Sequence, residues 1–184
     1  MILLIKLLLA HLIGDFVLQP DSWVKEKEVR KHRTPKLYLH ALLHGGIAWL
    51  LVWDADFWPA IIVITLSHFL IDLGKVQLQK PGNRIFWFIV DQLLHLLVII
   101  LVWYVWIGPA MSRNQFPLEK TLIILTAAVF LTTPSSVIIK TVISQWTPDT
   151  FYTVSSSLPD AGKFIGYLER LLVLTFLLYN HWEA

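Results

Sequence analysis

The chain has 184 residues, of which 56% are hydrophobic and only 15% are charged. Soluble domains are nearer half apolar and a quarter charged, so this composition and the mean hydropathy of +0.63 indicate an integral membrane protein. The net charge of +2 is too small to suggest a nucleic-acid partner, and the lack of cysteine excludes disulfides, thiolate metal sites and a cysteine nucleophile. The length predicts a single transmembrane domain over residues 1–184, without a separate soluble module.

Six apolar segments approach the roughly 20 residues needed to cross a bilayer. We therefore expect an all-α polytopic bundle with transmembrane helices at about 2–19, 36–53, 57–76, 85–107, 119–141 and 162–181. The first segment lacks the basic start and the cleavage site of a signal peptide, so we expect it to be a membrane helix. Thr34-Pro35 predicts the N-cap and first residue of the second helix. The sequence TTPSS at 132–136 predicts a kink or break in the fifth helix.

Lysine and arginine are unequally divided between the two sides of this expected bundle. The first, third and fifth loops with their flanks carry eleven of them, and the opposite side carries three. The positive-inside rule predicts that these three loops are cytoplasmic and that both termini lie outside. Helices 1–2 and helices 3–4 also resemble a duplicated hairpin, because HLIGDFVLQP at 11–20 is similar to HFLIDLGKVQLQKP at 68–81.

Four pairs of metal-type residues, each spaced i to i+4, lie within the apolar segments. The pairs are His11 and Asp15, His40 and His44, His68 and Asp72, and Asp91 and His95. The chain has 7 His and 8 Asp, and random placement of these residues gives about 1.2 such pairs. Residues four apart share one helix face, and polar groups in hydrocarbon are costly enough to be functional candidates.

Alternating helix directions place all four pairs in the cytoplasmic half of their helices. Helices 1 and 3 read His-then-Asp, whereas helix 4 reads Asp-then-His, so antiparallel threading sorts the residues by depth. The expected shallow layer contains Asp15, His40, Asp72 and Asp91, and the expected deeper layer contains His11, His44, His68 and His95. Three polar neighbours are expected to support these layers, namely Gln19, Lys75 and Gln92.

Histidine and carboxylate without thiolate suit zinc, iron, manganese or cobalt. Facing pairs on four helices are how bundles assemble two-metal sites, which generate hydroxide near neutral pH and clamp the oxygens of a phosphoester. We predict one or two divalent ions, with zinc favoured and iron or manganese as the other choices. One alternative is a mononuclear site, in which some of these residues hydrogen-bond to the metal ligands instead of binding the metal. The other is a hydrogen-bonded cluster without metal.

Glu169 and Arg170 are the predicted catalytic residues. They lie within the apolar run GKFIGYLERLL, in the same cytoplasmic half as the pairs. Arg170 can hold a phosphate oxygen bidentately, and Glu169 can serve as a ligand or a general base. The alternative is an intramembrane ion pair with an aspartate of the cluster.

The sequence resembles a known family in the order of its motifs: HLIGDFVLQ, then LHALLH, HFLIDLGK, FIVDQLLHL and GKFIGYLERLLVLTF. This order is similar to that of the bacterial membrane proteins called domain of unknown function 3307. The resemblance implies a protein of the bacterial inner membrane and supplies no activity. The His and Asp motifs are more loosely similar to those of membrane-bound metal-dependent hydrolases, an analogy that favours hydrolysis.

The leading prediction is a metal-dependent hydrolase that acts on a lipid or lipid-linked phosphoester at the cytoplasmic leaflet. The first alternative is a transporter or channel for divalent cations or protons that uses the same residues. The second is a membrane redox protein with di-iron or haem, and the third is a purely structural membrane subunit. The expected partner is a membrane lipid or lipid-linked substrate, and the sequence does not predict an oligomeric state.

Overall fold

The computed structural model describes residues 1–110, 116–144 and 161–179, and the side chains of these residues outside 107–117. Every regular element within these ranges is helical, which confirms the all-α fold class. The chain divides into two units, Met1–Thr126 and Ala127–Ala184.

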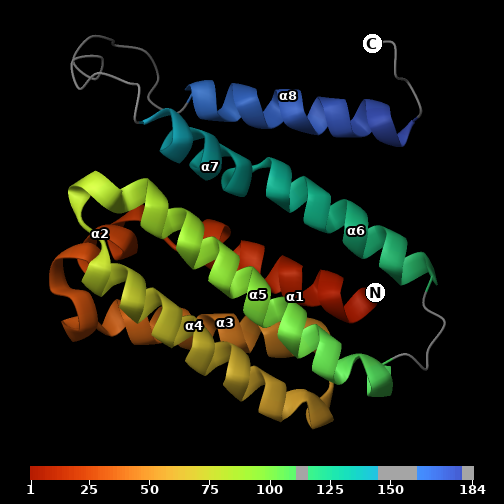
Figure 1. The fold of residues 1–184 in the computed structure, drawn as a ribbon. Coiled ribbons are helices and arrows are strands. Elements are labelled where there is room, and N and C mark those ends of the chain that lie inside the picture. Colours follow the sequence, from red (N-terminus) through yellow and green to blue (C-terminus); the bar gives the residue numbers. More distant parts are fainter. Residues whose placement is uncertain (111–115, 145–160, 180–184) are drawn as a thin grey trace. The chain divides into compact units, whose positions relative to one another are not determined.

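Four long helices of the first unit form a bundle (Figure 1). Each of the four contacts two others, because α1 and α4 both pack against α3 and α5. The helices of this unit are α1 (Ile2–Leu12), α2 (Asp21–Arg30), α3 (Pro35–Val52), α4 (Trp58–Leu78) and α5 (Arg84–Ala110). Short connections make α3, α4 and α5 antiparallel to their chain neighbours, as in other helical bundles.

The ends of these helices follow local sequence rules. Thr34 is the N-cap of α3, and its hydroxyl accepts a hydrogen bond from the Lys36 amide at 3.2 Å, with Pro35 in the first turn. The helix ends at Trp53, whose φ of 53° is left-handed. A 3₁₀ turn at Ala55–Phe57 then leads into α4, and another at Pro81–Asn83 leads into α5.

The segment between the first two expected transmembrane helices contains α2, a helix of ten residues. The chain bends by 80° between Ile2–Val17 and Asp21–Arg33, and α2 contacts α3 and α4. Glu28 fixes it in place by accepting hydrogen bonds from Arg84 at 2.6 and 2.8 Å and from Gln79 at 3.0 Å. The helix therefore covers the end of the bundle at which α4 finishes and α5 begins.

A helix is broken between α6 (Phe116–Leu131), which begins in the first unit, and α7 (Thr133–Ile143). Within the second unit, α7 packs against α8 (Ala161–Leu178). Pro134 cannot donate a backbone hydrogen bond, so the carbonyls before it need other partners. Ser135 Oγ donates to the Phe130 carbonyl at 2.6 Å, and Arg170 Nε donates to the Leu131 carbonyl at 2.6 Å. The break predicted from TTPSS is thus present.

Three helical spans among the described residues are long and apolar enough to cross a membrane: Ala55–Leu78, Pro81–Trp106 and Leu118–Ile143. A fourth is added if the bent pair Ile2–Val17 and Asp21–Arg33 counts as one span. These spans support the prediction of a membrane protein. Neither α3 nor α8 is among these spans, so the full set of six transmembrane helices stays a prediction.

Candidate metal centre

All eight residues of the four predicted pairs come together inside the four-helix bundle. Seven are buried as whole residues, and the Asp15 side chain is only 8% exposed. Their ligand atoms form three groups, within each of which all atoms lie less than 4.8 Å apart. The groups are His11 with Asp15, His44 and His68; His40 with His68 and Asp72; and Asp15 with Asp91 and His95.

A π-helical turn at Ile13–Val17 carries Asp15 into this cluster. Such turns are rare in helices and are frequent at functional sites. The preceding residue, Gly14, leaves room for the His44 ring, because a Cβ atom built at Gly14 would overlap that ring. The residues of α1 and α3 therefore approach one another more closely here than larger side chains would allow.

The Asp15 carboxylate faces four histidines from three helices. Its Oδ1 atom lies 3.1 Å from His40 Nε2, 2.9 Å from His44 Nε2 and 3.5 Å from His68 Nε2. Its Oδ2 atom lies 3.8 Å from His11 Nε2. The nitrogens of His40 and His68 are themselves 3.0 Å apart. Three imidazole nitrogens thus lie within 3.5 Å of one carboxylate oxygen.

Hydrogen bonding alone does not account for this crowding. His40 Nε2 lies about 3 Å from three polar atoms: Asp15 Oδ1 at 3.1 Å, Gln19 Nε2 at 3.0 Å and His68 Nε2 at 3.0 Å. A ring nitrogen carries either one proton or one lone pair, so it can make only one of these hydrogen bonds. Ligand atoms of one tetrahedral ion lie roughly 3.3 Å apart, because each bond to nitrogen or oxygen is about 2.0–2.2 Å long. The distances from Asp15 Oδ1 to the nitrogens of His40, His44 and His68, from 2.9 to 3.5 Å, bracket this value.

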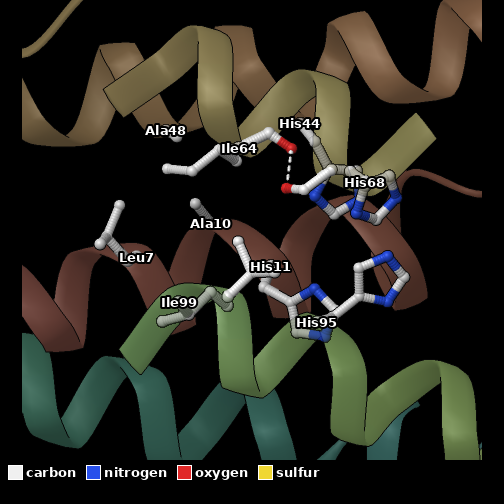
Figure 2. Close-up of a pocket in the computed structure, with 11 residues that line it drawn as sticks. Leu7, Ala10, His11, His44, Ala48, Ile64, His68, His95 and Ile99 are labelled. Carbon is white, nitrogen blue, oxygen red and sulfur yellow. Dashed lines mark hydrogen bonds between the residues drawn. The ribbon is translucent and has the colours of Figure 1, made fainter. Parts of the chain in front are cut away.

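The four histidines of the predicted deeper layer line a small cavity (Figure 2). The His44 and His68 rings are stacked at 3.6 Å, and the His68 and His95 rings at 4.1 Å, between centroids. The cavity has a volume of about 20 Å³, which is enough for one water molecule. None of the four residues of the predicted shallow layer lines it, in agreement with the predicted sorting by depth.

Two lysines neutralise two of the three carboxylates of the shallow layer. Lys75 Nζ donates to Asp91 Oδ2 at 2.8 Å, and Lys27 Nζ donates to Asp72 Oδ2 at 2.5 Å. Lys75 was among the expected neighbours of the pairs. Lys27 was not predicted as a neighbour, because it lies in a charged segment between two apolar ones. Its side chain is nevertheless only 6% exposed. The sequence does carry one signal for Lys27: the apolar residues Trp23 and Val24 lie four and three positions before it. This spacing indicates that Lys27 lies on the inner face of a helix.

The two glutamines expected beside the pairs also contact the cluster. Gln92 Nε2 donates to Asp15 Oδ2 at 3.0 Å and to Asp91 Oδ2 at 3.1 Å. Its Oε1 atom faces His11 Nε2 at 3.3 Å. Gln92 thereby connects α5 to the π-helical turn and fixes the orientation of two carboxylates.

Glu169 and Arg170 belong to the second unit, whose position relative to the first is not determined. Glu169 is exposed. Arg170 donates to the Leu131 carbonyl at 2.6 Å and to Ser136 Oγ at 2.7 Å, so its guanidinium stabilises the break between α6 and α7. The catalytic roles of these two residues stay predictions.

The fold and the cluster define a helical membrane protein whose buried histidines and aspartates could hold a metal ion. The chain belongs to the family described as "Protein of unknown function (DUF3307)", whose sequence profile matches residues 3–125. This match confirms the predicted family and includes all eight residues of the cluster, while Glu169 and Arg170 lie beyond it. Neither the curated proteins nor the solved structures contain a significant match to the chain.

Proposed function

We propose that the protein binds a divalent transition-metal ion between Asp15, His40, His44 and His68 and uses it to hydrolyse a phosphoester. The observation that carries the proposal is the set of ligand-atom spacings around Asp15 Oδ1, from 2.9 Å to His44 to 3.5 Å to His68. The donor set of carboxylate and imidazole, without sulfur, suits zinc, iron or manganese.

The charges of the cluster favour a bound cation. Asp72 and Asp91 each have a lysine partner, whereas the ion-pair partners of Asp15 among the described residues are all histidines. With neutral histidines, three carboxylates and two ammonium groups leave one net negative charge in a buried site. An unpaired buried charge is strongly unfavourable, and a cation bound at Asp15 removes this cost.

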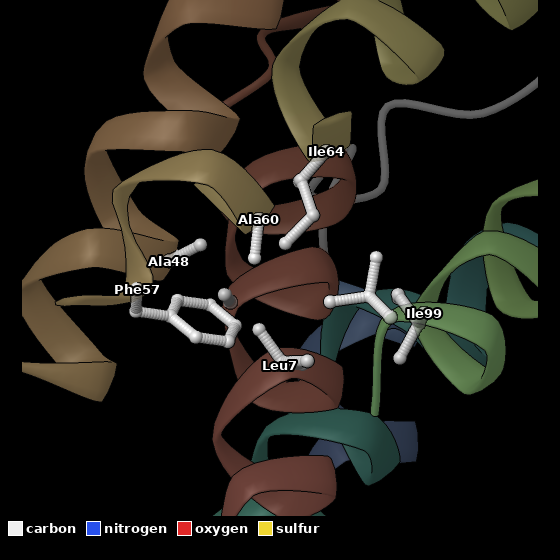
Figure 3. Close-up of a cluster of buried hydrophobic side chains, with 8 residues drawn as sticks. Leu7, Ala48, Phe57, Ala60, Ile64 and Ile99 are labelled. Atoms are coloured by element: carbon white, nitrogen blue, oxygen red, sulfur yellow. The ribbon is translucent and has the colours of Figure 1, made fainter. Parts of the chain in front are cut away.

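The bundle also contains a core of buried apolar side chains (Figure 3). Eight buried apolar residues fill this part of the bundle: Leu7, Ala10, Ala48, Phe57, Ala60, Ile64, Ile99 and Val102. Besides the four histidines and Ser67, all the residues that line the small cavity are apolar, so we infer that the site ends blindly on this side. A blind site supports a resident ion, as an enzyme requires, over the transit of ions expected of a transporter.

The proposed reaction is metal-assisted hydrolysis. A divalent ion held by Asp15, His40, His44 and His68 would lower the pKa of a bound water molecule, so that this water reacts as hydroxide near neutral pH. In the balanced reaction the water oxygen would replace the alcohol oxygen on phosphorus, and a proton of that water would pass to the departing lipid alcohol.

The substrate is expected to be a lipid or lipid-linked phosphoester. The apolar outer surface of the bundle supports this choice, since Leu42, Leu66, Leu93 and Leu101 are all more than half exposed and are suited to contact with lipid. The distribution of basic residues supports a cytoplasmic position for the α2 end and the cluster, in a bacterial inner membrane.

The function can be tested with the full chain in lipid nanodiscs. Purified protein is supplied with zinc or manganese, and phosphate release is measured from diacylglycerol phosphates and polyprenyl phosphates. We expect metal-dependent release that is lost in His44→Ala and retained in His32→Ala, a control at an exposed histidine outside the cluster. A protein that holds its metal and hydrolyses none of these esters would overturn the hydrolase proposal. Metal uptake into proteoliposomes or strong visible absorption would then support the transporter or redox alternative.

A further inference from the structure

A second group of polar atoms lies beside Asp15 without hydrogen-bond partners. Asp91 and His95, both on α5, are only 2% and 4% exposed. Asp91 Oδ1 and both ring nitrogens of His95 make no hydrogen bond with any described residue. Buried polar atoms are normally satisfied, so these three atoms require an explanation.

Packing does not explain why histidine occupies position 95. Its neighbours on two sides are the rings of His68 and His11, at centroid distances of 4.1 and 5.3 Å. A phenylalanine or leucine would fill such a place without leaving two ring nitrogens unpaired. A neutral imidazole always presents one N–H and one lone pair, and the lone pair is the group that binds a metal ion.

The geometry of Asp91 points to the same conclusion. Lys75 and Gln92 both donate to its Oδ2 atom, at 2.8 and 3.1 Å, which orients the carboxylate and leaves Oδ1 free. Oδ1 lies 3.9 Å from His95 Nδ1. Metal-binding carboxylates and histidines are usually oriented in this way, by hydrogen bonds to the side-chain atom that does not bind the metal.

We propose that Asp91, His95 and Asp15 hold a second divalent cation, with Asp15 bridging it to the ion at His40, His44 and His68. One ligand atom from each of the three residues lies within 4.8 Å of the others. Asp15 can bridge because its Oδ1 atom faces the histidines of the first site and its Oδ2 atom faces Gln92 at 3.0 Å. The inference rests on the proposed function for the first ion and adds a two-metal mechanism, in which paired ions clamp the attacking and leaving oxygens.

The small cavity supplies the remaining coordination position. It is lined by His95 together with His11, His44 and His68, so it borders both proposed ions. Its volume of about 20 Å³ admits one water molecule. A water placed there would be available to either ion or to both.

The test counts manganese ions and measures the magnetic coupling between them. Full-length protein is stripped with chelator, reloaded with Mn²⁺ and examined by elemental mass spectrometry and electron paramagnetic resonance. We expect two Mn²⁺ per chain with a spin-coupled spectrum. We expect one Mn²⁺ with an uncoupled six-line spectrum in His95→Ala and in Asp91→Asn, and two in the exposed-site controls His32→Ala and Asp56→Asn.

The outcomes separate the second site from the first. One uncoupled Mn²⁺ in the wild type, unchanged in His95→Ala, would overturn the second site and leave the first intact. No Mn²⁺ in the folded wild type would overturn both proposals. Circular dichroism and size-exclusion chromatography establish folding, and Asp91→Asn keeps the side-chain shape should His95→Ala fail to fold. Loss of both ions from folded Asp91→Asn would also contradict two separable sites.

Discussion

Asp15 differs from the other two buried aspartates of the bundle in the kind of partner that surrounds it. Asp72 and Asp91 are each neutralised by a lysine, whereas Asp15 is surrounded by imidazoles and by the amide of Gln92. An imidazole adapts to a metal ion by presenting its lone pair, but a lysine ammonium has no lone pair to offer. Asp15 is therefore the residue on which metal binding should depend most.

Replacing Asp15 with asparagine tests this dependence at nearly constant side-chain shape. Asp15→Asn removes the negative charge and the bridging oxygen. We therefore expect metal affinity to fall by more than the roughly 10–100-fold loss typical when a residue that hydrogen-bonds to a metal ligand is replaced. A competitive titration with a metal-binding dye measures the affinity. The matched control is Asp56→Asn, at an exposed position. Equal affinities in Asp15→Asn and wild type would contradict the assignment of Asp15 as a ligand.

Gly14 provides a test that changes no ligand. In Gly14→Ala the new methyl group would overlap the His44 ring, whereas in Gly46→Ala it would meet nothing within 4 Å. We expect Gly14→Ala to displace His44 and weaken metal binding at least about tenfold. Losses of this size are typical when a group that orients a metal ligand is lost. Gly46→Ala should bind metal as the wild type does. Isothermal titration of both variants measures the difference, and equal affinities would show that the approach of His44 to Gly14 is unimportant.

At the scale of elements, α2 is the helix that the sequence did not predict. Its residues Asp21–Arg30 are mostly charged, so neither hydropathy nor length marks it as a membrane element. Its position comes from tertiary contacts, namely Glu28 with Arg84 and Lys27 with Asp72. Contacts between residues far apart in the chain leave no periodic pattern in the sequence. This explains why α2 was not predicted.

The Lys27–Asp72 pair should contribute strongly to stability. Lys27→Met leaves a buried carboxylate without its partner, and breaking a buried pair in this way costs about 3–5 kcal/mol. Thermal unfolding in detergent should therefore occur at a lower temperature in Lys27→Met. Adding Asp72→Asn to the same chain should restore much of the loss, because the unpaired charge is removed. A double variant as unstable as Lys27→Met would show that Lys27 acts through packing alone.

Arg170 should stabilise the break between α6 and α7. Arg170→Met removes the donors to the Leu131 carbonyl and to Ser136 Oγ, and an unsatisfied buried acceptor costs about 1–3 kcal/mol. We expect a lower unfolding temperature with unchanged metal content, measured by calorimetry and elemental analysis. The predicted role in phosphate binding adds a separate expectation, a raised KM for the phosphoester. Unchanged stability would contradict the structural role.

At the scale of the molecule, the sequence predicted the fold class, the family and the convergence of the eight residues. Four pairs at helical spacing in apolar segments can avoid the cost of burial only by facing one another, so their convergence followed from energetics. The π-helical turn at Asp15 did not follow, because a single extra residue in a turn leaves no trace in an i to i+4 spacing. The single transmembrane domain expected over residues 1–184 stays a prediction.

Metal-edge X-ray absorption of the reloaded protein tests the central claim of a buried histidine and carboxylate metal centre. We predict an inner shell of nitrogen and oxygen at about 2.0–2.2 Å, together with the multiple scattering of several imidazole rings. The imidazole component should weaken in His44→Ala and persist in His32→Ala. A protein that retains no metal after purification and reloading, or a spectrum without imidazole scattering, would contradict the claim.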